Sequence, residues 1–275
     1  MSENIFAVSN IAWNRHDDES VLDLLARFGV NGVEIAPSKI WSDLSTVQEK
    51  DALNYRTFLA DHGFCIPAFQ AILYGHPELQ VFDPAAHAAF FSRLELVARL
   101  ASWLGASVLV FGAPKNRKRN GIAYQEAFKL AADFFHKAGD IVQQYDCVLG
   151  IEANPVEYQC DFITSTADAA LLVKASDSKG IKLHIDTGAT ALTHEDTAEL
   201  LQNLQTEFVH YHISEPMLAN PEISRQIDHA AAFRALKAIH YQGSVSIEMK
   251  AQDPDHENLE SALRFITGAM KNADF

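Results

Sequence analysis

The chain has 275 residues, of which 48% are hydrophobic and 21% are charged, with only 13 glycines and 9 prolines. This composition excludes disorder, collagen-like repeats and low-complexity tracts, and the length fits one folded domain, with two small domains as the alternative. The 36 acidic and 22 basic side chains give a net charge of −14, which repels a phosphate backbone and excludes non-specific binding to nucleic acid.

The cysteines and the apolar stretches indicate where the protein works. Cys65, Cys147 and Cys160 are too few and too scattered for a disulfide framework or a zinc knuckle, and their odd number favours reduced thiols. The opening MSENIFAVSN lacks a basic region followed by an apolar core, and charges such as Arg93 and Arg99 interrupt the longest apolar stretches. We therefore expect a cytoplasmic protein with no membrane partner.

Short runs of β-branched or aromatic residues alternate along the chain with longer runs that repeat apolar residues at helical spacing. The pattern predicts strands at residues 6–13, 30–39, 64–74, 107–115, 147–155, 181–188, 207–216 and 243–250. It predicts helices at 20–29, within 46–62, at 84–104, 124–145 and 166–175, before each of the last two strands, and at 257–270. The chain is therefore built from eight successive strand–helix units.

Eight such units without an interdomain linker favour one closed sheet. Right-handed crossovers between parallel strands make an eight-stranded barrel the simplest topology. A doubly wound open sheet is the alternative, but the glycine-rich phosphate turn that it usually carries is missing after Trp13. We predict an α/β protein with a single (β/α)8 TIM barrel domain over residues 1–275.

Polar side chains stand at matching places in the last four strands. A parallel strand that is covered on both faces is apolar until it emerges at its carboxyl end. Glu152, Asp186, His212 and Glu248 each follow an apolar stem there, and strand alternation turns them towards the barrel axis. Three carboxylates at one point repel one another, so we predict a divalent cation held by three oxygens and one imidazole nitrogen.

The segments GVNGVEIAP, LGIEANP, HIDTG, HISEP and GSVSIEMK resemble the xylose isomerase-like barrels. Within that family they are similar to the sugar isomerases and epimerases, which include hydroxypyruvate isomerase and the ketohexose 3-epimerases. The resemblance covers essentially the whole chain. It implies that Glu152, Asp186, His212 and Glu248 bind one divalent ion (Mn²⁺, Mg²⁺, Co²⁺ or Zn²⁺). It also implies that Glu152 and Glu248 are the catalytic acid/base pair on opposite faces of the substrate carbon.

Two positions depart from the family pattern and weaken any inference about the substrate. Many relatives have a histidine three residues after the aspartate of the sixth strand, where this chain has Ala189. Many sugar epimerases have an arginine shortly after the ligand histidine, whereas the stretch SEPMLAN contains Glu215 and no arginine. The missing histidine and the acidic net charge also count against the endonuclease branch of the family, which builds a three-zinc cluster.

The loop GAPKNRKRNG carries four cations, Lys115, Arg117, Lys118 and Arg119, in an acidic protein. It is either a solvated loop or a clamp for a phosphate or carboxylate, with Lys115 and Arg117 as the contacts because they lie nearest the strand end. Residues 74–82 are too long for a minimal turn, so we expect them to cover the site.

Four further residues are weaker candidates for substrate binding. Glu34 ends the second strand and either binds a substrate hydroxyl or pairs with a neighbour inside the barrel. His184 lies one layer below Asp186 and is expected to orient the ligands or to fill the interior. Lys250 neutralises an anionic substrate or pairs with a carboxylate, and Gln70 lines a sugar pocket.

We therefore predict a divalent-metal-dependent isomerase or epimerase acting on a small carbonyl sugar, sugar phosphate or sugar acid through an ene-diolate. The first alternative is a metal-dependent lyase or dehydratase of a hydroxy-keto acid. It would form the same metal-stabilised enolate and differ only in expelling a hydroxyl group. A non-catalytic sugar-binding barrel is the second. A homo-oligomer is compatible with each of these functions.

Overall fold

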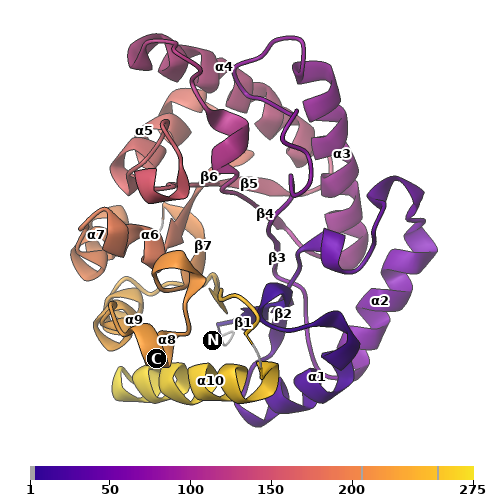
Figure 1. The fold of residues 1–275 in the computed structure, drawn as a ribbon, viewed down its shortest axis with the longest axis vertical. Helices are drawn as coiled ribbons and strands as arrows, with labels where there is room; N and C mark the ends of the chain where they lie inside the picture. The colour runs from indigo at the N-terminus through magenta and orange to yellow at the C-terminus, as the bar shows by residue number, and fades with distance from the viewer. Residues whose placement is uncertain (1–3, 206, 253) are drawn as a thin grey trace.

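The computed structural model describes residues 4–205, 207–252 and 254–275, and its strands are arranged around a central axis (Figure 1). Eight strands form one parallel sheet in the order β2-β1-β8-β7-β6-β5-β4-β3. Bridges from Gly32 to Cys65 and from Ile35 to Phe69 connect its two ends, so the sheet closes into a nearly complete barrel. The strands are β1 (Phe6–Ser9), β2 (Gly32–Glu34), β3 (Ala68–Phe69), β4 (Val108–Phe111), β5 (Val148–Glu152), β6 (Ile181–Asp186), β7 (Phe208–Ile213) and β8 (Ser244–Ile247).

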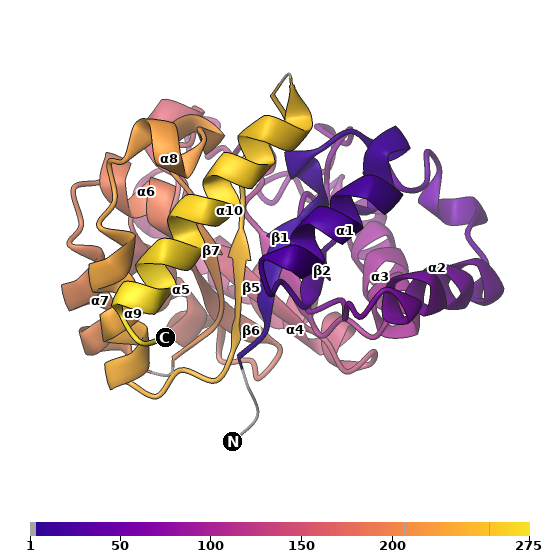
Figure 2. The ribbon, with the colours of Figure 1, turned by 90° about the horizontal axis from the view of Figure 1, so that it is seen from below.

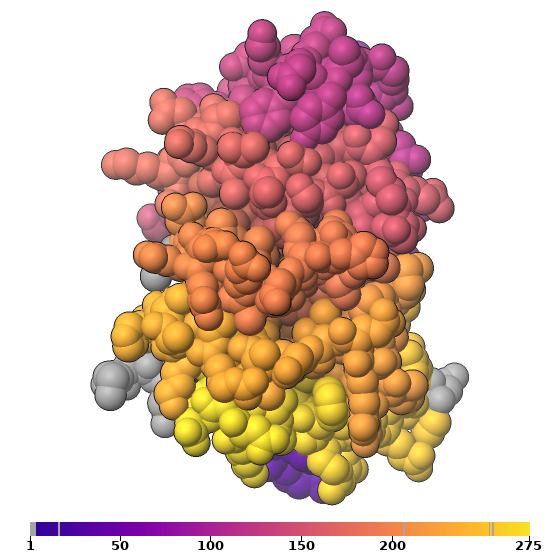
Figure 3. Space-filling view, turned by 90° about the vertical axis from the view of Figure 1, so that its left-hand side faces the viewer, coloured from indigo at the N-terminus to yellow at the C-terminus, as the bar shows by residue number. Residues whose placement is uncertain are grey.

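Helices surround the barrel on the outside (Figure 1). The last helix lies beside the first, which completes the ring (Figure 2). Seen from the side, the later part of the chain runs in order across the surface, from magenta to yellow (Figure 3). The α-helices are α1 (Asp18–Arg27), α2 (Glu49–Asp61), α3 (His87–Leu104), α4 (Tyr124–Gln143), α5 (Thr166–Ser176), α6 (Thr187–Leu192), α7 (Thr197–Leu204), α8 (Pro221–Ser224), α9 (His229–Ala238) and α10 (Asp255–Asn272).

Short 3₁₀ turns occupy several of the connections between these elements. They are η1 (Asn10–Ala12), η2 (Arg15–Asp17), η3 (Pro37–Lys39), η4 (Leu44–Thr46), η5 (Pro114–Arg117), η6 (Val156–Tyr158) and η7 (Pro216–Leu218). None of the helices in the described parts of the chain is long and apolar enough to cross a membrane.

Alternation along the strands separates an apolar outer face from a polar inner face. Ile151, Ile185, Tyr211 and Ile247 are buried in the main hydrophobic core, to which the helices also contribute. Their sequence neighbours on the other face are the polar residues at the strand ends. The predicted (β/α)8 barrel is confirmed, and the same alternation positions the candidate site.

All eight strands are shorter than the predicted ranges, and the early ends of β1 and β3 have local causes. β1 ends at Ser9 because Ser9 Oγ accepts a hydrogen bond from the Ile11 amide and starts the turn η1. β3 contains only two residues. Pro67, which precedes β3, has no amide hydrogen, and Ala71 adopts a positive φ of 52° that strands do not contain. Both early endings leave irregular backbone at the carboxyl rim of the barrel.

Candidate functional site

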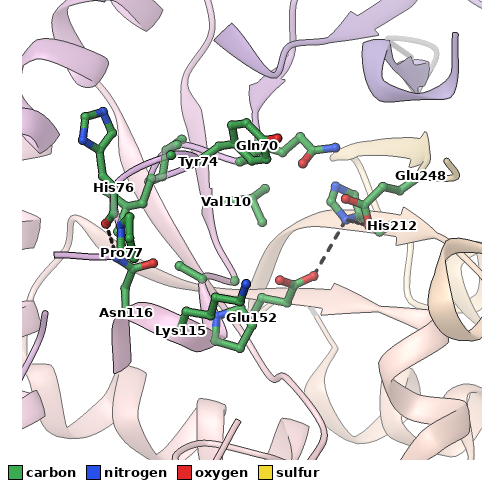
Figure 4. A pocket seen from close by; sticks show the side chains of 17 residues that line it. Gln70, Tyr74, His76, Pro77, Val110, Lys115, Asn116, Glu152, His212 and Glu248 are labelled. Atoms are coloured by element: carbon green, nitrogen blue, oxygen red, sulfur yellow. Dashed lines mark hydrogen bonds and ion pairs between the residues drawn. The ribbon is translucent and has the colours of Figure 1, made fainter. Parts of the chain in front are cut away.

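The four polar residues at the ends of the last four strands lie together. Glu152 and Asp186 are the last residues of β5 and β6, His212 is the last but one of β7, and Glu248 follows β8. One possible ligand atom from each of the four lies within 4.8 Å of those of the other three. The close-up shows Glu152, His212 and Glu248 facing one space (Figure 4). The structure therefore brings together the complete quartet predicted to bind a metal.

The ring of His212 is oriented by its hydrogen bonds. Its Nε2 donates to the two carboxylate oxygens of Glu34, at 2.9 and 3.1 Å. Its Nδ1 is buried and has no hydrogen-bond partner among the described residues. This nitrogen lies 3.3 Å from Glu248 Oε2, 3.7 Å from Asp186 Oδ2 and 3.9 Å from Glu152 Oε1. Because Nε2 is held by Glu34, Nδ1 is the ring nitrogen that faces the three carboxylates, and it can offer a lone pair to a cation once it has lost its proton.

Short polar side chains hold the carboxylates of the quartet. Asp186 Oδ1 accepts from the Ala189 amide at 2.6 Å, and Asp186 Oδ2 accepts from Ser214 Oγ at 2.6 Å. Glu152 Oε2 accepts from Asn154 Nδ2 at 3.1 Å. These hydrogen bonds restrict both carboxylates before any ligand binds.

Burial and the neighbouring carboxylates make Glu152 and Asp186 harder to ionise. Burial raises the pKa of Glu152 to about 8, and the charges of Asp186 and Glu248 add to this shift. Burial and the charge of Glu248 raise the pKa of Asp186 to about 6. For His212, burial lowers the pKa, but the carboxylates of Glu34 and Glu248 outweigh it and keep the pKa well above its usual value. A positive charge at the centre of the quartet would be strongly stabilised.

The residues present fit a divalent cation. Three carboxylates offer hard oxygen ligands, and the unpartnered His212 Nδ1 offers one nitrogen. Oxygen-rich sets suit Mg²⁺ and Mn²⁺, and an added imidazole also suits Zn²⁺ and Co²⁺. The donor set therefore fits the predicted class of ion without selecting one member.

Glu34 lies at the end of β2, on the side of His212 that faces away from the other carboxylates. It is fully buried, accepts from Ser246 Oγ at 2.7 Å and lies 3.3 Å from His210 Nε2. Burial raises the pKa of Glu34, but the charges of His212 and His210 outweigh it and hold the pKa well below its usual value. Glu34 is not among the described residues that line the pocket, so the structure pairs it with neighbours inside the barrel. Its predicted contact with a substrate hydroxyl stays a prediction.

His184 lies below the quartet on the barrel axis, as expected. Both of its ring nitrogens are buried without a hydrogen-bond partner among the described residues, and Nε2 is 3.7 Å from Glu152 Oε1. Its ring meets that of His212 edge-on, with 4.2 Å between centroids, and stacks on His210 at 5.3 Å. Burial and the charges of these two histidines hold the pKa of His184 well below its usual value. His184 therefore packs beneath Glu152 as a neutral ring.

A pocket of about 560 Å³ opens above the quartet. Glu152, His212 and Glu248 form one end of it, and residues 70–77 and 112–116 form much of the rest (Figure 4). The long segment predicted to cover the site therefore contributes a wall. Gln70 lines this pocket, with its Nε2 donating to Ser9 Oγ at 2.7 Å.

The structure separates the cations predicted to bind an anionic substrate. Lys115 is exposed and lines the pocket, whereas Lys250 is exposed outside the lining. Arg117 is only 1% exposed and also lies outside the lining. Its Nη1 donates to the backbone oxygen of Glu152 at 2.7 Å, and its guanidinium lies 6.0 Å from the ring centroid of Phe111. Arg117 therefore supports the end of β5, and its part in an anion clamp stays a prediction.

Sequence reasoning missed several residues that support the site. Asn154 and Ser214 lie two positions after Glu152 and His212, and Ser246 lies two positions before Glu248. Strand alternation turns residues two apart to the same side, so this spacing is a signal for the face that they share. The hydrogen-bond partners of Ser214 and Ser246, which are Asp186 and Glu34, lie on other strands. The burial of Arg117 has no such signal, because it depends on how the loop packs.

The comparisons with known proteins agree with this fold. A family model described as xylose isomerase-like TIM barrel matches residues 22–269. The chain therefore belongs to the xylose isomerase-like TIM barrel family, and the resemblance inferred from its sequence is confirmed. No curated protein sequence shows a significant match to the chain.

Three solved structures illustrate the similarity in fold. D-Psicose 3-epimerase from Clostridium cellulolyticum H10 is 13% identical, with a TM-score of 0.78 over 98% of both chains. An L-ribulose 3-epimerase is 16% identical, with a TM-score of 0.80 over 99% of this chain and 96% of the other. The IOLI protein with a bound zinc atom is 17% identical, with a TM-score of 0.71 over 98% of both chains. At these identities the likeness establishes the shared fold.

Proposed function

We propose that the protein is a divalent-metal-dependent isomerase or epimerase of a small carbonyl sugar, sugar phosphate or sugar acid, acting through an ene-diolate. The observation that carries this proposal is the convergence of three carboxylates on the unpartnered Nδ1 of His212 at the bottom of a pocket. Among solved structures that share the fold are epimerases of psicose and ribulose, which supports the same class of reaction for this chain.

Glu152, Asp186, His212 and Glu248 would hold one divalent ion, Mn²⁺, Mg²⁺, Co²⁺ or Zn²⁺. When bound, such an ion would polarise the carbonyl of the substrate and stabilise the negative charge that develops on its oxygens. The carboxyl groups of Asp186 and Glu152 have to lose their protons before they can serve as ligands. Their raised pKa values therefore make ion binding depend on pH between about 6 and 8.

Glu152 and Glu248 would transfer the proton at the reacting carbon. They reach the pocket from β5 and β8, which are separated in the barrel by β6 and β7. Both side chains line the pocket, so their carboxylates could take up and return a proton at a bound substrate. An epimerase requires a base on each face of the substrate carbon, whereas an aldose–ketose isomerase needs only one.

The remaining predictions about the whole protein form part of the same proposal. We infer that residues 1–275 form one domain, that the substrate is a small molecule and that the protein works in the cytoplasm. The excess of acidic residues supports the absence of a nucleic-acid partner. A homo-oligomer is compatible with this function.

Proton exchange in D₂O tests the proposed function. The metal-loaded protein is incubated with a panel of ketoses, aldoses, sugar phosphates and hydroxy-keto acids, and deuterium uptake and products are followed by NMR. We expect deuterium at the carbon next to the carbonyl of at least one sugar, together with its isomer or epimer. Loss of a hydroxyl group would identify a dehydratase instead, and no exchange with any compound would favour a non-catalytic binding protein.

A further inference from the structure

Three histidine rings, those of His184, His210 and His212, lie against one another inside the barrel. His212 Nε2 is held by Glu34, and His210 Nδ1 lies 2.6 Å from Ser244 Oγ. In the part of the chain that the structure describes, His184 alone of the three has both ring nitrogens buried without a hydrogen-bond partner. These contacts therefore explain one nitrogen of His212 and one of His210, but neither nitrogen of His184.

Filling the barrel at this level does not require a histidine. A buried polar group that is left unpaired costs about 1–3 kcal/mol, and an apolar side chain of similar size carries no such cost. The fold nevertheless leaves room for His184, because a Cβ atom on Gly150 of β5 would lie 3.2 Å from the Cβ atom of His184. An unpaired buried group of this kind is explained by a ligand that the side chain binds, such as an ion.

The distance from His184 to the quartet fits an ion that both would bind. Two ligand atoms that each lie about 2.1 Å from one ion can be at most about 4.2 Å apart. His184 Nε2 lies 3.7 Å from Glu152 Oε1, which is within this limit. The distances of 3.3 to 3.9 Å from His212 Nδ1 to the three carboxylates are within it as well. One nitrogen of His184, one nitrogen of His212 and one oxygen of Glu152 also lie within 4.8 Å of one another.

We propose that His184 is a further ligand of the divalent ion, so that the ion binds two imidazoles and the site prefers Zn²⁺ and Co²⁺ to Mg²⁺. Carboxylate oxygens suit Mg²⁺ and Mn²⁺, whereas each added imidazole favours Zn²⁺ and Co²⁺. The quartet fits all four ions, and His184 supplies the nitrogen that discriminates between them. This inference rests on the proposed function for the presence of an ion, and it adds one ligand and a preference among ions.

Counting the histidines that bind Co²⁺ tests the inference in the wild-type protein. The paramagnetic ion shifts the ring N–H proton of each bound histidine far outside the ordinary NMR range, and ¹⁵N-labelled histidine identifies these signals by their splitting. We expect two such signals for each bound Co²⁺. His184→Phe keeps a ring in the barrel and should leave one signal, that of His212. His210→Phe is the matched control, since His210 is buried beside His184, and it should leave both signals.

The affinities for two ions distinguish a ligand from a residue that only packs beneath Glu152. Competition with a chromophoric chelator measures the dissociation constant of Zn²⁺, and calorimetry measures that of Mg²⁺. His184→Phe should weaken Zn²⁺ binding at least about tenfold, because losing a ligand matters at least as much as losing the support of one. It should change Mg²⁺ binding by less than about threefold, because Mg²⁺ prefers oxygen ligands. Equal loss for both ions would overturn the inference. If His184→Phe does not fold, the number of signals in the wild-type protein decides.

The outcomes separate this inference from the proposed function. A single histidine signal in a protein that exchanges the hydrogen of a sugar in D₂O keeps the proposed function and overturns the inference. Two signals in a protein that exchanges the hydrogen of no sugar keep the additional ligand and overturn the catalysis. A second Co²⁺ ion per chain that is lost in His184→Phe overturns the binding of one ion by both histidines. Absence of binding to Co²⁺, Zn²⁺ and Mg²⁺ overturns both proposals.

Discussion

The hydrogen bond between Glu34 and His212 decides which nitrogen of His212 is available to a ligand. Glu34 accepts from Nε2 at 2.9 Å, so Nδ1 is the nitrogen that faces the carboxylates. Carboxylates that hold the second nitrogen of a ligand histidine fix its tautomer and raise its basicity. Glu34 is fully buried and also accepts from Ser246, so its carboxylate cannot turn away.

We predict that Glu34→Gln weakens the affinity for Mn²⁺ by about 10- to 100-fold, because an amide holds the His212 ring less firmly than a carboxylate does. Calorimetric titration with Mn²⁺ measures the effect. The control is Glu260→Gln, which removes a surface ion pair with Arg264 of 2.8 Å and should leave the affinity unchanged. Wild-type affinity in Glu34→Gln would show that Glu34 does not position the ligand.

Glu152→Gln and Glu248→Gln test proton transfer separately from metal binding. With excess metal restoring occupancy, each variant lacks one base, and turnover should fall about 10²- to 10⁴-fold in an epimerase. If one variant exchanges deuterium into the substrate without inverting the carbon, the glutamate that remains still removes and returns a proton on its own face of that carbon. An isomerase should lose activity in only one of the two variants. Full activity in both would remove the acid/base proposal.

At the scale of elements, the end of β5 depends on the turn η5. Arg117 reaches from this turn to the backbone oxygen of Glu152 and, at 3.5 Å, to that of Ile163. A buried guanidinium in this position binds the loop after β4 to the loop after β5, and it fixes the backbone that carries Glu152. The basic loop therefore contains one structural cation, Arg117, and one cation at the pocket, Lys115.

We expect Arg117→Ala to lower the free energy of unfolding by about 2–4 kcal/mol, because it leaves buried carbonyl oxygens without their donor. Lys115→Ala is the matched control and should change the free energy of unfolding by less than about 0.5 kcal/mol, since Lys115 is exposed. Urea unfolding measures the free energy of unfolding of both variants and of the wild-type protein. An unchanged stability in Arg117→Ala, together with a raised KM for an anionic substrate, would restore the predicted anion clamp.

At the scale of the whole molecule, the cluster of carboxylates opposes folding unless a cation balances it. Burial raises the pKa of Glu152 to about 8 and that of Asp186 to about 6, from ordinary values of 4.5 and 3.8. Below about pH 6.5 the lowered pKa values of His184 and His210 oppose this effect. Between about pH 6.5 and pH 8 the native state binds more protons than the unfolded state, so the stability of the metal-free protein falls as pH rises through this range. The net charge of −14 adds a general repulsion that also destabilises the native state.

We predict that the melting temperature of EDTA-treated protein decreases between about pH 6.5 and pH 8 and that Glu152→Gln reduces this decrease. Saturating Mn²⁺ should raise the melting temperature most at the upper end of the range, because the ion binds the deprotonated carboxylates of the native state. Differential scanning calorimetry at several pH values measures these shifts. A melting temperature that is independent of both pH and metal would contradict the proposed site.

The sequence alone was sufficient to predict the eight strand–helix units, the barrel and the quartet at the ends of the last four strands. These features depend on local periodicity, because an apolar strand that ends in a polar residue shows the same pattern wherever its neighbours lie. The structure confirms the barrel and brings the quartet together. Its role as a metal site stays a prediction.

Only the tertiary structure decided which partners support the quartet. Glu34 and His212 are 178 positions apart, and they meet because the barrel closes β2 and β1 against β8 and β7. Arg117 is buried because the loops after β4 and β5 pack on one another, although its sequence context is that of a solvated charge run. Contacts between distant segments leave no periodic signal in the chain, because each depends on the position of the other in the closed barrel.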